Sequence, residues 1–157
     1  MNQNVIDAIS VHDDKNIKGF FGPYRWLSNF HLVEITYEGI TYPSTENAYQ
    51  ASKFRDGEEE LELKHSFSAI SPASAKKTSK LIPIRPDWDD IKLKVMEDLN
   101  RLKYQNPVCC RLLIDTGDKY LEETNWWNDK FWGVCRGEGE NHLGKIIMKI
   151  REEIKNG

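Results

Sequence analysis

The sequence predicts an α+β fold, a single compact and mostly helical domain with a small β-sheet or hairpins. Three observations support this prediction. The length of 157 residues is enough for one domain with its own hydrophobic core. Apolar residues recur at helical spacing in the longer segments, whereas alternation with a period of two is confined to short ones. The chain also contains no internal repeat and no linker-like stretch that would separate two domains.

The N-terminal residues are polar and weakly patterned, so we expect residues 1–17 to be a loose lead-in and residues 18–155 to form the domain. Gly22-Pro23 ends a first short strand and precedes an aromatic loop over residues 24–30. Two later segments alternate with a period of two around the turn Glu38-Gly39, which predicts a β-hairpin. The strands that we expect are residues 17–21, 33–37, 40–42 and 120–123.

Five further segments show the apolar spacing or the capping residues of helices. Ser71-Pro72 combines a serine cap with proline at the first helical position. The run Glu58-Glu59-Glu60 suits a solvated first turn, where the helix dipole favours negative charge. These predicted helices are residues 58–66, 73–79, 88–105, 108–114 and 143–154.

The stretch over residues 42–54 is the strongest candidate for a functional element. Ser44 can cap a helix that runs from Glu46 to Lys53. On that helix Glu46, Gln50 and Lys53 are spaced i, i+4 and i+7, so they share one face over two turns. A carboxylate, an amide and an amine on one face of a helix could line one side of an active site. The same residues are also ordinary in a first helical turn and on a helix surface.

Three loops place aromatic rings beside Asn, Asp or Arg, the groups that a nucleoside-type ligand needs. They are residues 25–30, residues 85–88, and residues 128–133 with a glycine-rich continuation over residues 137–141. The glycine-rich segment could let backbone N–H groups approach a phosphate at the start of the last helix, although Glu138 and Glu140 would repel it. Each loop residue also has a structural explanation: core packing for Trp88 and Trp132, a turn for Asp129, a loop cap for Asn29 and an ion pair for Arg85.

Composition excludes several other classes of protein. The formal net charge of −3 argues against a generic nucleic-acid coat. Three cysteines without a CxxC pair and four scattered histidines predict no metal site, and we expect the cysteines to be reduced. No GxSxG motif is present, so nucleophilic serine chemistry has little support. P-loop and Rossmann signatures are also absent, and we expect no cofactor. With neither a signal peptide nor an apolar run of about 18 residues, we expect a cytoplasmic protein without membrane contact.

Seven groups of residues along nearly the whole chain form an ordered set of motifs. They are Trp26–Phe30, Tyr42–Glu46 with Gln50–Phe54, Ser71-Pro72 with Ala75-Lys76, Arg85 with Asp87-Trp88, Val95-Met96, Asp129 with Trp132-Gly133, and Gly137–Asn141 with Leu143-Gly144, Met148 and Arg151. In order and spacing this set resembles the YbiA-like, or NADAR (NAD and ADP-ribose associated), family of N-glycosidases. One motif alone would be weak, and the ordered set from Phe20 to Arg151 is specific.

The resemblance implies a small cytosolic α+β enzyme with a YbiA-like fold that cleaves an N-glycosidic bond. Two substrate classes are associated with the family. One is the phosphoribosylamino-pyrimidine intermediates of riboflavin synthesis, and the other is ADP-ribose attached to guanine in nucleic acid or in a nucleotide. Both join the anomeric carbon of ribose to an exocyclic amine of a heterocycle. The sequence determines neither which of the two substrate classes applies nor the oligomeric state.

The resemblance also implies roles for individual residues. Glu46 matches the family's catalytic glutamate, and the matching site positions are Asn29, Lys53, Trp88, Asp129 and Trp132. We take Glu46, Lys53 and Asp129 as the catalytic candidates. The full set of substrate-binding candidates is Asn29, Arg25, Gln50, Arg85, Trp88, Trp132, Gly133 and Asn141.

The chain departs from the family pattern at three places. Asn47 stands where many members have His, Lys77-Thr78-Ser79 where Gly-Arg is common, and Cys135-Arg136 where a more glycine-like pair occurs. These departures leave the candidate catalytic residues intact and bear on the choice of substrate.

Two routes could break the C1–N bond. In the first, Glu46 is a general base on water and Asp129 stabilises oxocarbenium character at C1. In the second, the sugar ring opens, Lys53 attacks C1 as a neutral amine to form a Schiff base, and Glu46 shuttles protons. The second route requires a partly desolvated lysine, and we favour a direct role for Lys53.

Two other classes of function are compatible with parts of the sequence. A catalytically silent ADP-ribose or nucleotide-binding module would bind ligand without releasing a base, but it would not need Glu46, Lys53 and Asp129 together. An interaction protein would expose large tryptophan patches.

Overall fold

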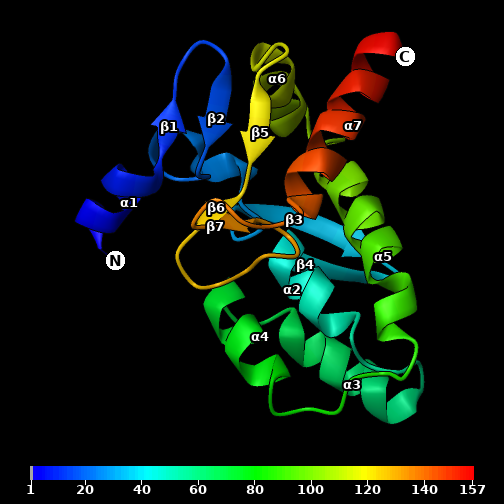
Figure 1. Cartoon of the computed structure of the whole chain (residues 1–157). Coiled ribbons are helices and arrows are strands. Elements are labelled where there is room, and N and C mark those ends of the chain that lie inside the picture. The colour runs from blue at the N-terminus through cyan, green and yellow to red at the C-terminus, as the bar shows by residue number, and fades with distance from the viewer. Residues whose placement is uncertain (1) are drawn as a thin grey trace. The chain divides into compact units, whose positions relative to one another are not determined.

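The computed structural model describes residues 2–157, and its helices and short strands confirm a mostly helical α+β fold (Figure 1). The chain divides into two compact units. One comprises Asn29–Gln105, and the other combines the segment up to Ser28 with Asn106–Gly157. None of the helices among residues 2–157 is long and apolar enough to span a membrane.

The Asn29–Gln105 unit is built from one hairpin and four helices. Its strands β3 and β4 are antiparallel, with Tyr37 opposite Ile40, so the predicted hairpin is confirmed. A register shift between Leu32 and Ile35 makes the pairing irregular at the far end. The elements are β3 (Leu32–Tyr37), β4 (Ile40–Ser44), α2 (Thr45–Ala51), α3 (Glu58–Phe67), α4 (Pro72–Ser79) and α5 (Trp88–Lys103).

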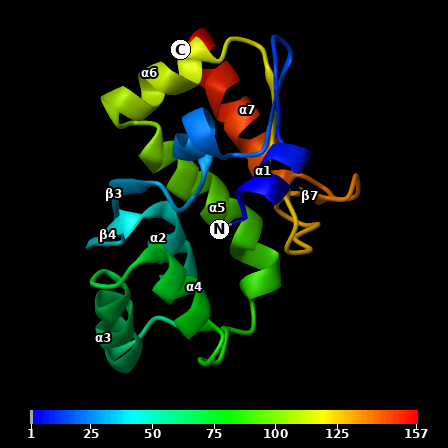
Figure 2. The same ribbon diagram turned by 90° about the vertical axis from the view of Figure 1, so that its left-hand side faces the viewer.

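Helix α2 is the central element of this unit. All seven of its residues are buried, and it packs against the hairpin and against α3, α4 and α5. Figure 2 shows it beside β3 and β4, with α3 and α4 on its other side. Ser44 caps the helix as predicted, because its Oγ accepts the backbone N–H of Asn47 at 3.1 Å. The helix ends at Ala51, so Lys53 lies in the turn beyond it, where its N–H donates to the carbonyl of Gln50 at 3.2 Å.

In the other unit, one sheet pairs strands from the N-terminal segment with a strand at residues 120–122. Strand β2 runs antiparallel to β1 and parallel to β5, a strand about 100 residues later. Strands β6 and β7 form a separate parallel pair. The elements are α1 (Gln3–Ile9), β1 (Val11–His12), β2 (Asn16–Lys18), the 3-10 helix η1 (Gly22–Leu27), α6 (Pro107–Asp115), β5 (Tyr120–Glu122), β6 (Thr124–Asn125), β7 (Val134–Cys135) and α7 (His142–Asn156).

The N-terminal segment differs from the expected loose lead-in over residues 1–17. Its first residue lies outside the described part, and the rest contains α1, β1 and the start of β2. Asn2 caps α1 through its Oδ1, which accepts the N–H of Val5 at 3.3 Å, and Ile6 of that helix is buried. The segment is ordered by pairing with a distant strand, which its local composition does not reveal.

Candidate functional site

Glu46 lies at the start of α2 and is almost completely buried, with 6% of its surface exposed. Its side chain is held from the same helix, because Gln50 Nε2 donates to Glu46 Oε1 at 2.7 Å. The predicted common face of these two residues is therefore confirmed. Its backbone is held as well, since the N–H of Glu46 donates to the carbonyl of Asn29 at 3.0 Å. A buried carboxylate fixed in this way is preorganised for proton transfer.

Gln50 is in turn held by Ser79, which the sequence marked only as part of a departure from the family pattern. Ser79, the last residue of α4, donates its hydroxyl proton to Gln50 Oε1 at 2.7 Å. Gln50 and Ser79 are only 4% and 2% exposed. The predicted substrate-binding amide is thus engaged at both ends within the protein.

Asn47 joins α2 to the turn that follows α3. Its Nδ2 donates to the carbonyls of Phe67 and Ile70 at 2.9 and 2.8 Å. Its Oδ1 accepts the hydroxyl proton of Ser44 at 2.6 Å. At this departure from the family pattern, a wholly buried amide therefore fixes the first turn that carries Glu46.

Lys53 is half-buried beyond the end of α2. Burial lowers the pKa of its amine, the Glu46 carboxylate opposes that effect, and the like charges of Lys76, Lys80 and Lys92 add to it. The Lys53 amine also lies 5.4 Å from the centre of the Tyr49 ring. A lowered pKa increases the neutral, nucleophilic fraction of a lysine at a given pH.

An aromatic pair continues this side of the unit. The rings of Tyr49 and Trp88 lie 5.2 Å apart at an angle of 57°, and Trp88 is buried. The packing explanation for Trp88 therefore applies, although its neighbour Tyr49 is in contact with Lys53. A backbone hydrogen bond of 2.8 Å from the N–H of Arg85 to the carbonyl of Lys53 joins the two segments.

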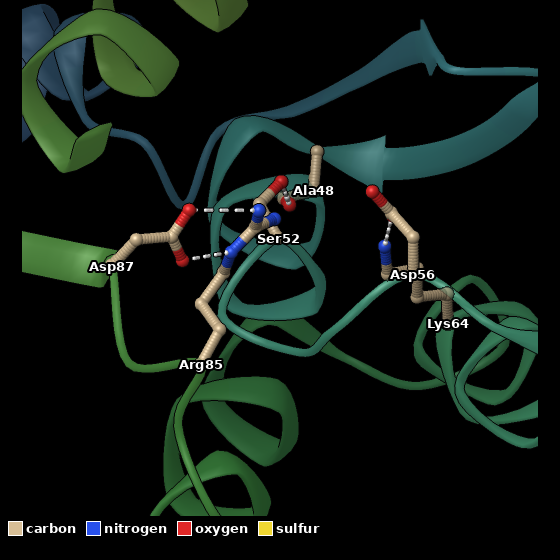
Figure 3. Close-up of polar contacts among 6 residues, drawn as sticks. All are labelled: Ala48, Ser52, Asp56, Lys64, Arg85 and Asp87. Atoms are coloured by element: carbon tan, nitrogen blue, oxygen red, sulfur yellow. Dashed lines mark hydrogen bonds and ion pairs between the residues drawn. The ribbon is translucent and has the colours of Figure 1, made fainter.

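Arg85 forms the ion pair that was its structural explanation. Its Nε and Nη2 donate to the two carboxylate oxygens of Asp87 at 2.7 and 3.1 Å (Figure 3). A substrate phosphate would have to share or replace Asp87 as the partner of this guanidinium.

Asn29 begins the same unit and is 7% exposed. Its Nδ2 lies 3.4 Å from Met96 Sδ, a weak acceptor, and its Oδ1 accepts no hydrogen bond from residues 2–157. Such a buried amide oxygen can receive a hydroxyl proton from a sugar.

A separate cavity of about 230 Å³ lies between the hairpin and α3. Figure 3 shows two contacts beside it, Ser52 donating to the carbonyl of Ala48 and the 2.8 Å ion pair of Lys64 with Asp56. No predicted site residue is among those that line it: Tyr37, Glu38, Ile40, Tyr42, Ser52, Asp56, Gly57, Leu61 and Lys64.

In the other unit, Asp129 has the geometry of a turn residue. Its Oδ1 accepts the backbone N–H groups of Phe131 and Trp132 at 3.1 and 2.9 Å. Asn125 holds the same turn, because its Oδ1 accepts the N–H of Asp129 and its Nδ2 donates to the Asp129 carbonyl at 2.8 Å. One carboxylate oxygen of Asp129 is therefore engaged in folding this loop.

Gly133 and Asn141 have clear structural roles. A Cβ at Gly133 would overlap the carbonyl oxygen of Glu123, so only glycine fits there. Asn141 has a left-handed backbone (φ 52°), and its side chain donates to the Leu121 carbonyl at 2.9 Å and accepts the N–H of Glu123 at 3.1 Å. These contacts join β5 to the start of α7.

The weak possibility that the start of α7 binds phosphate through its N–H groups is not supported by their hydrogen bonds. The N–H groups of Asn141, His142 and Leu143 donate to the carbonyls of Gly133, Phe131 and Trp132 at 3.0 to 3.2 Å. The glycine-rich segment therefore closes the start of the helix with protein carbonyls.

Two further binding candidates lie in this unit. Trp132 is half-buried and packs edge-on against Phe131, with ring centres 4.7 Å apart. Arg25 is exposed and donates to Ser28 Oγ at 3.2 Å. Both remain predictions as substrate contacts.

Within the Asn29–Gln105 unit the structure gathers Glu46, Gln50, Lys53 and Trp88 around α2. Asn29 and Arg85 belong to the same unit, and the other five candidates belong to the second unit: Arg25, Asp129, Trp132, Gly133 and Asn141. No sequence signal predicted the contact of Ser79 with Gln50, because it arises only through the packing of α4 on α2. Asn47 could have been found from its position three residues after the Ser44 cap. Residues 2–157 contain no group of His, Cys, Asp or Glu arranged to hold a metal ion.

Comparison with known proteins identifies the family. A family model described as the NADAR domain matches residues 16–155. The chain is 31% identical over 158 residues to N-glycosidase YbiA of Escherichia coli (strain K12), covering 98% of this chain and 91% of that protein. It is 34% identical over 138 residues to N-glycosidase Npun_R5314 of Nostoc punctiforme, covering 85% and 88%.

A longer relative and a solved structure extend the comparison. The chain is 37% identical over 136 residues to riboflavin biosynthesis protein VVA0006 of Vibrio vulnificus, and the match spans 84% of this chain and 36% of that protein. The NMR structure of E. coli YbiA matches with a TM-score of 0.78 at 28% identity, covering 99% of this chain and 94% of that one. With its family model matched over residues 16–155, the chain belongs to the NADAR domain family.

Proposed function

We propose that this protein is an N-glycosidase that hydrolyses the C1–N bond between ribose and an exocyclic amine of a heterocycle. The observation that carries the proposal is the combination, on and just beyond α2, of a buried and oriented carboxylate with an amine of lowered pKa. Two relatives that this chain matches over most of their length are named N-glycosidases, which supports the same activity.

Lys53 and Glu46 have complementary roles in this reaction. After the ribose ring opens, the Lys53 amine attacks C1 and forms a C–N bond. Glu46 takes up the proton that the attacking Lys53 nitrogen loses and passes it to the heterocyclic amine as the original C1–N bond breaks. Water then adds to C1 with Glu46 as base, Glu46 returns this proton to the Lys53 nitrogen, and the free sugar aldehyde is released. Glu46 thus takes up a proton and gives it back in each half of the reaction.

The alternative route uses Asp129 to stabilise oxocarbenium character at C1. The Schiff-base route is favoured because Lys53 has a lowered pKa, whereas Asp129 already has one oxygen committed to two backbone N–H groups. Asp129 therefore stays a candidate for substrate contact rather than the preferred catalyst.

The substrate is proposed to be nucleotide-like. Both family substrate classes fit this description, the phosphoribosylamino-pyrimidines and ADP-ribosylated guanine. The named riboflavin biosynthesis relative favours the first class. Asn29 is the proposed partner of a sugar hydroxyl, and Trp88 with Tyr49 forms the aromatic side of the site. A cytoplasmic location stays a prediction.

The decisive experiment is to incubate the protein with a phosphoribosylamino-pyrimidine and, separately, with ADP-ribosylated guanosine monophosphate. Mass spectrometry should detect the released heterocycle, or guanosine monophosphate with free ADP-ribose. Ligand-induced thermal stabilisation without release from either compound would instead identify a silent binding module.

Two variants test the assigned roles. Glu46→Gln should abolish turnover and preserve binding, and retained activity would remove Glu46 from the mechanism. Borohydride added during turnover should reduce a Schiff base and leave a covalent sugar adduct on Lys53. Absence of the adduct, together with activity in Lys53→Ala, would exclude the Schiff-base route.

A further inference from the structure

Three buried side chains from two helices form one chain of hydrogen bonds that ends at Glu46. Ser79 Oγ donates to Gln50 Oε1 at 2.7 Å, and Gln50 Nε2 donates to Glu46 Oε1 at 2.7 Å. All three residues are at least 94% buried. Since this donor order directs an N–H toward Oε1, it suits a Glu46 whose Oε1 carries no proton, as in the carboxylate.

The Ser79 hydroxyl has a second acceptor within reach. Its Oγ also lies 3.0 Å from the carbonyl oxygen of Lys76, one turn earlier on α4. A hydroxyl carries a single proton, so Ser79 donates either to Gln50 or to Lys76 at one time. When it donates to Lys76, its oxygen lone pairs can accept a hydrogen bond from Gln50.

We propose that Ser79 is a positioning residue that lets the Gln50 amide bind Glu46 in both of its protonation states. With Glu46 ionised, the order is Ser79 to Gln50 to Glu46, as observed. With Glu46 protonated on Oε1, the oxygen that faces Gln50, the amide turns over: the Glu46 O–H donates to Gln50 Oε1, Gln50 Nε2 donates to Ser79 Oγ, and Ser79 donates to the carbonyl of Lys76. The three-residue chain stays hydrogen-bonded throughout, and no net proton enters or leaves it apart from the one on Glu46.

This arrangement rests on the proposed function, in which Glu46 takes up a proton and then gives it back. An amide that could not turn over would direct its N–H at the hydroxyl on Oε1, so two donors would meet in a buried site and the step that uses this protonated form would be slower. Ser79 removes that penalty because its hydroxyl is both a donor and an acceptor.

A titration of the free protein tests the switch without any substrate. The side-chain carboxyl carbon of Glu46 and the amide nitrogen of Gln50 are followed by NMR in protein labelled with ¹³C and ¹⁵N. Both signals should change with the same midpoint. In Ser79→Ala each protonation state loses one hydrogen bond, so the midpoint should move by less than about 0.3 pH units. A midpoint raised by roughly one unit would mean that Ser79 supports only the ionised form, and would overturn the proposal.

Kinetics supply the second test, with whichever of the two substrates the wild-type protein turns over. Ser79→Ala should lower kcat roughly tenfold with KM unchanged, and Ser79→Thr, which keeps the hydroxyl, should restore at least half of the rate. In a Gln50→Ala background Ser79→Ala should have no further effect, because Ser79 acts through Gln50. Ser74→Ala, on the exposed side of the same helix, is the matched control and should be unchanged.

The outcomes separate the two ideas. Failure of the wild-type protein to release a heterocycle would refute the proposed function, while the NMR titration would still decide the role of Ser79. An unchanged kcat in Ser79→Ala, or losses that add in the double variant, would refute the role of Ser79. If Ser79→Ala does not fold, Ser79→Cys keeps the size of the side chain with only a weak donor and should show the same reduction in kcat.

Discussion

Replacement of Asn47 by alanine should destabilise the protein strongly, although Asn47 is not a proposed catalytic residue. The substitution removes three side-chain hydrogen bonds, to the carbonyls of Phe67 and Ile70 and from the hydroxyl of Ser44. Each contributes about 1 kcal/mol net, so the free energy of unfolding should fall by about 3 kcal/mol. For a chain of this length, that loss corresponds to a decrease in Tm of roughly 9 °C.

Urea denaturation followed by tryptophan fluorescence, with Tm from calorimetry, measures this loss. Asn4→Ala, an exposed amide on α1, is the control and should stay within about 0.5 kcal/mol of wild type. Asn47→Asp should be at least as damaging as Asn47→Ala, because a carboxylate would face two carbonyl oxygens in a buried site. A loss below about 1 kcal/mol for Asn47→Ala would refute the view that this amide fixes the first turn of α2.

Three other predictions concern the site and its supporting loop. Because burial lowers the pKa of Lys53, kcat/KM should rise about tenfold per pH unit below that pKa and become constant before pH 10.5, the ordinary pKa of lysine, and Lys53→Arg should be inactive. A value of kcat/KM that still rises at pH 10.5 would contradict this. Asp129→Asn keeps the Oδ1 acceptor of the turn, so turnover should stay within about threefold of wild type and Tm should hardly change; a loss of about 1000-fold would favour the oxocarbenium route. Gly133→Ala should lower the free energy of unfolding in urea by about 3 kcal/mol, whereas the control Gly117→Ala, which adds only backbone strain at φ 64°, should lower it by about 1 kcal/mol. Equal losses would show that the protein relieves the overlap of the new Cβ with the Glu123 carbonyl.

Local signals in the sequence were sufficient for most of the elements. Ser44 capped α2, Ser71-Pro72 began α4, and Glu38-Gly39 turned the hairpin, because each of these effects acts within four residues. The common face of Glu46 and Gln50 followed from helical spacing for the same reason.

Contacts between distant segments were beyond the reach of such signals. Residues 16–18 became a strand through pairing with Tyr120–Glu122, so the polar N-terminal segment was ordered rather than loose. Ser79 joined the site because α4 packs on α2, and the N–H groups at the start of α7 were occupied by carbonyls from residues 131–133. The helix expected to reach Lys53 ended at Ala51, and the Lys53 carbonyl accepts a hydrogen bond from the distant Arg85 N–H, a contact that local spacing does not reveal.

That backbone contact has a consequence for how relatives of this protein could diverge. The carbonyl of Lys53 is held by the peptide N–H of Arg85, which every residue except proline can supply, so this bond constrains the backbone at residue 85 and does not depend on the Arg85 side chain. Insertions or deletions in the connector that carries Arg85 would shift the lysine relative to Glu46 without altering either residue. Family members with identical reactive groups could therefore act on sugars of different size, and the length of the connector is the feature to compare among them.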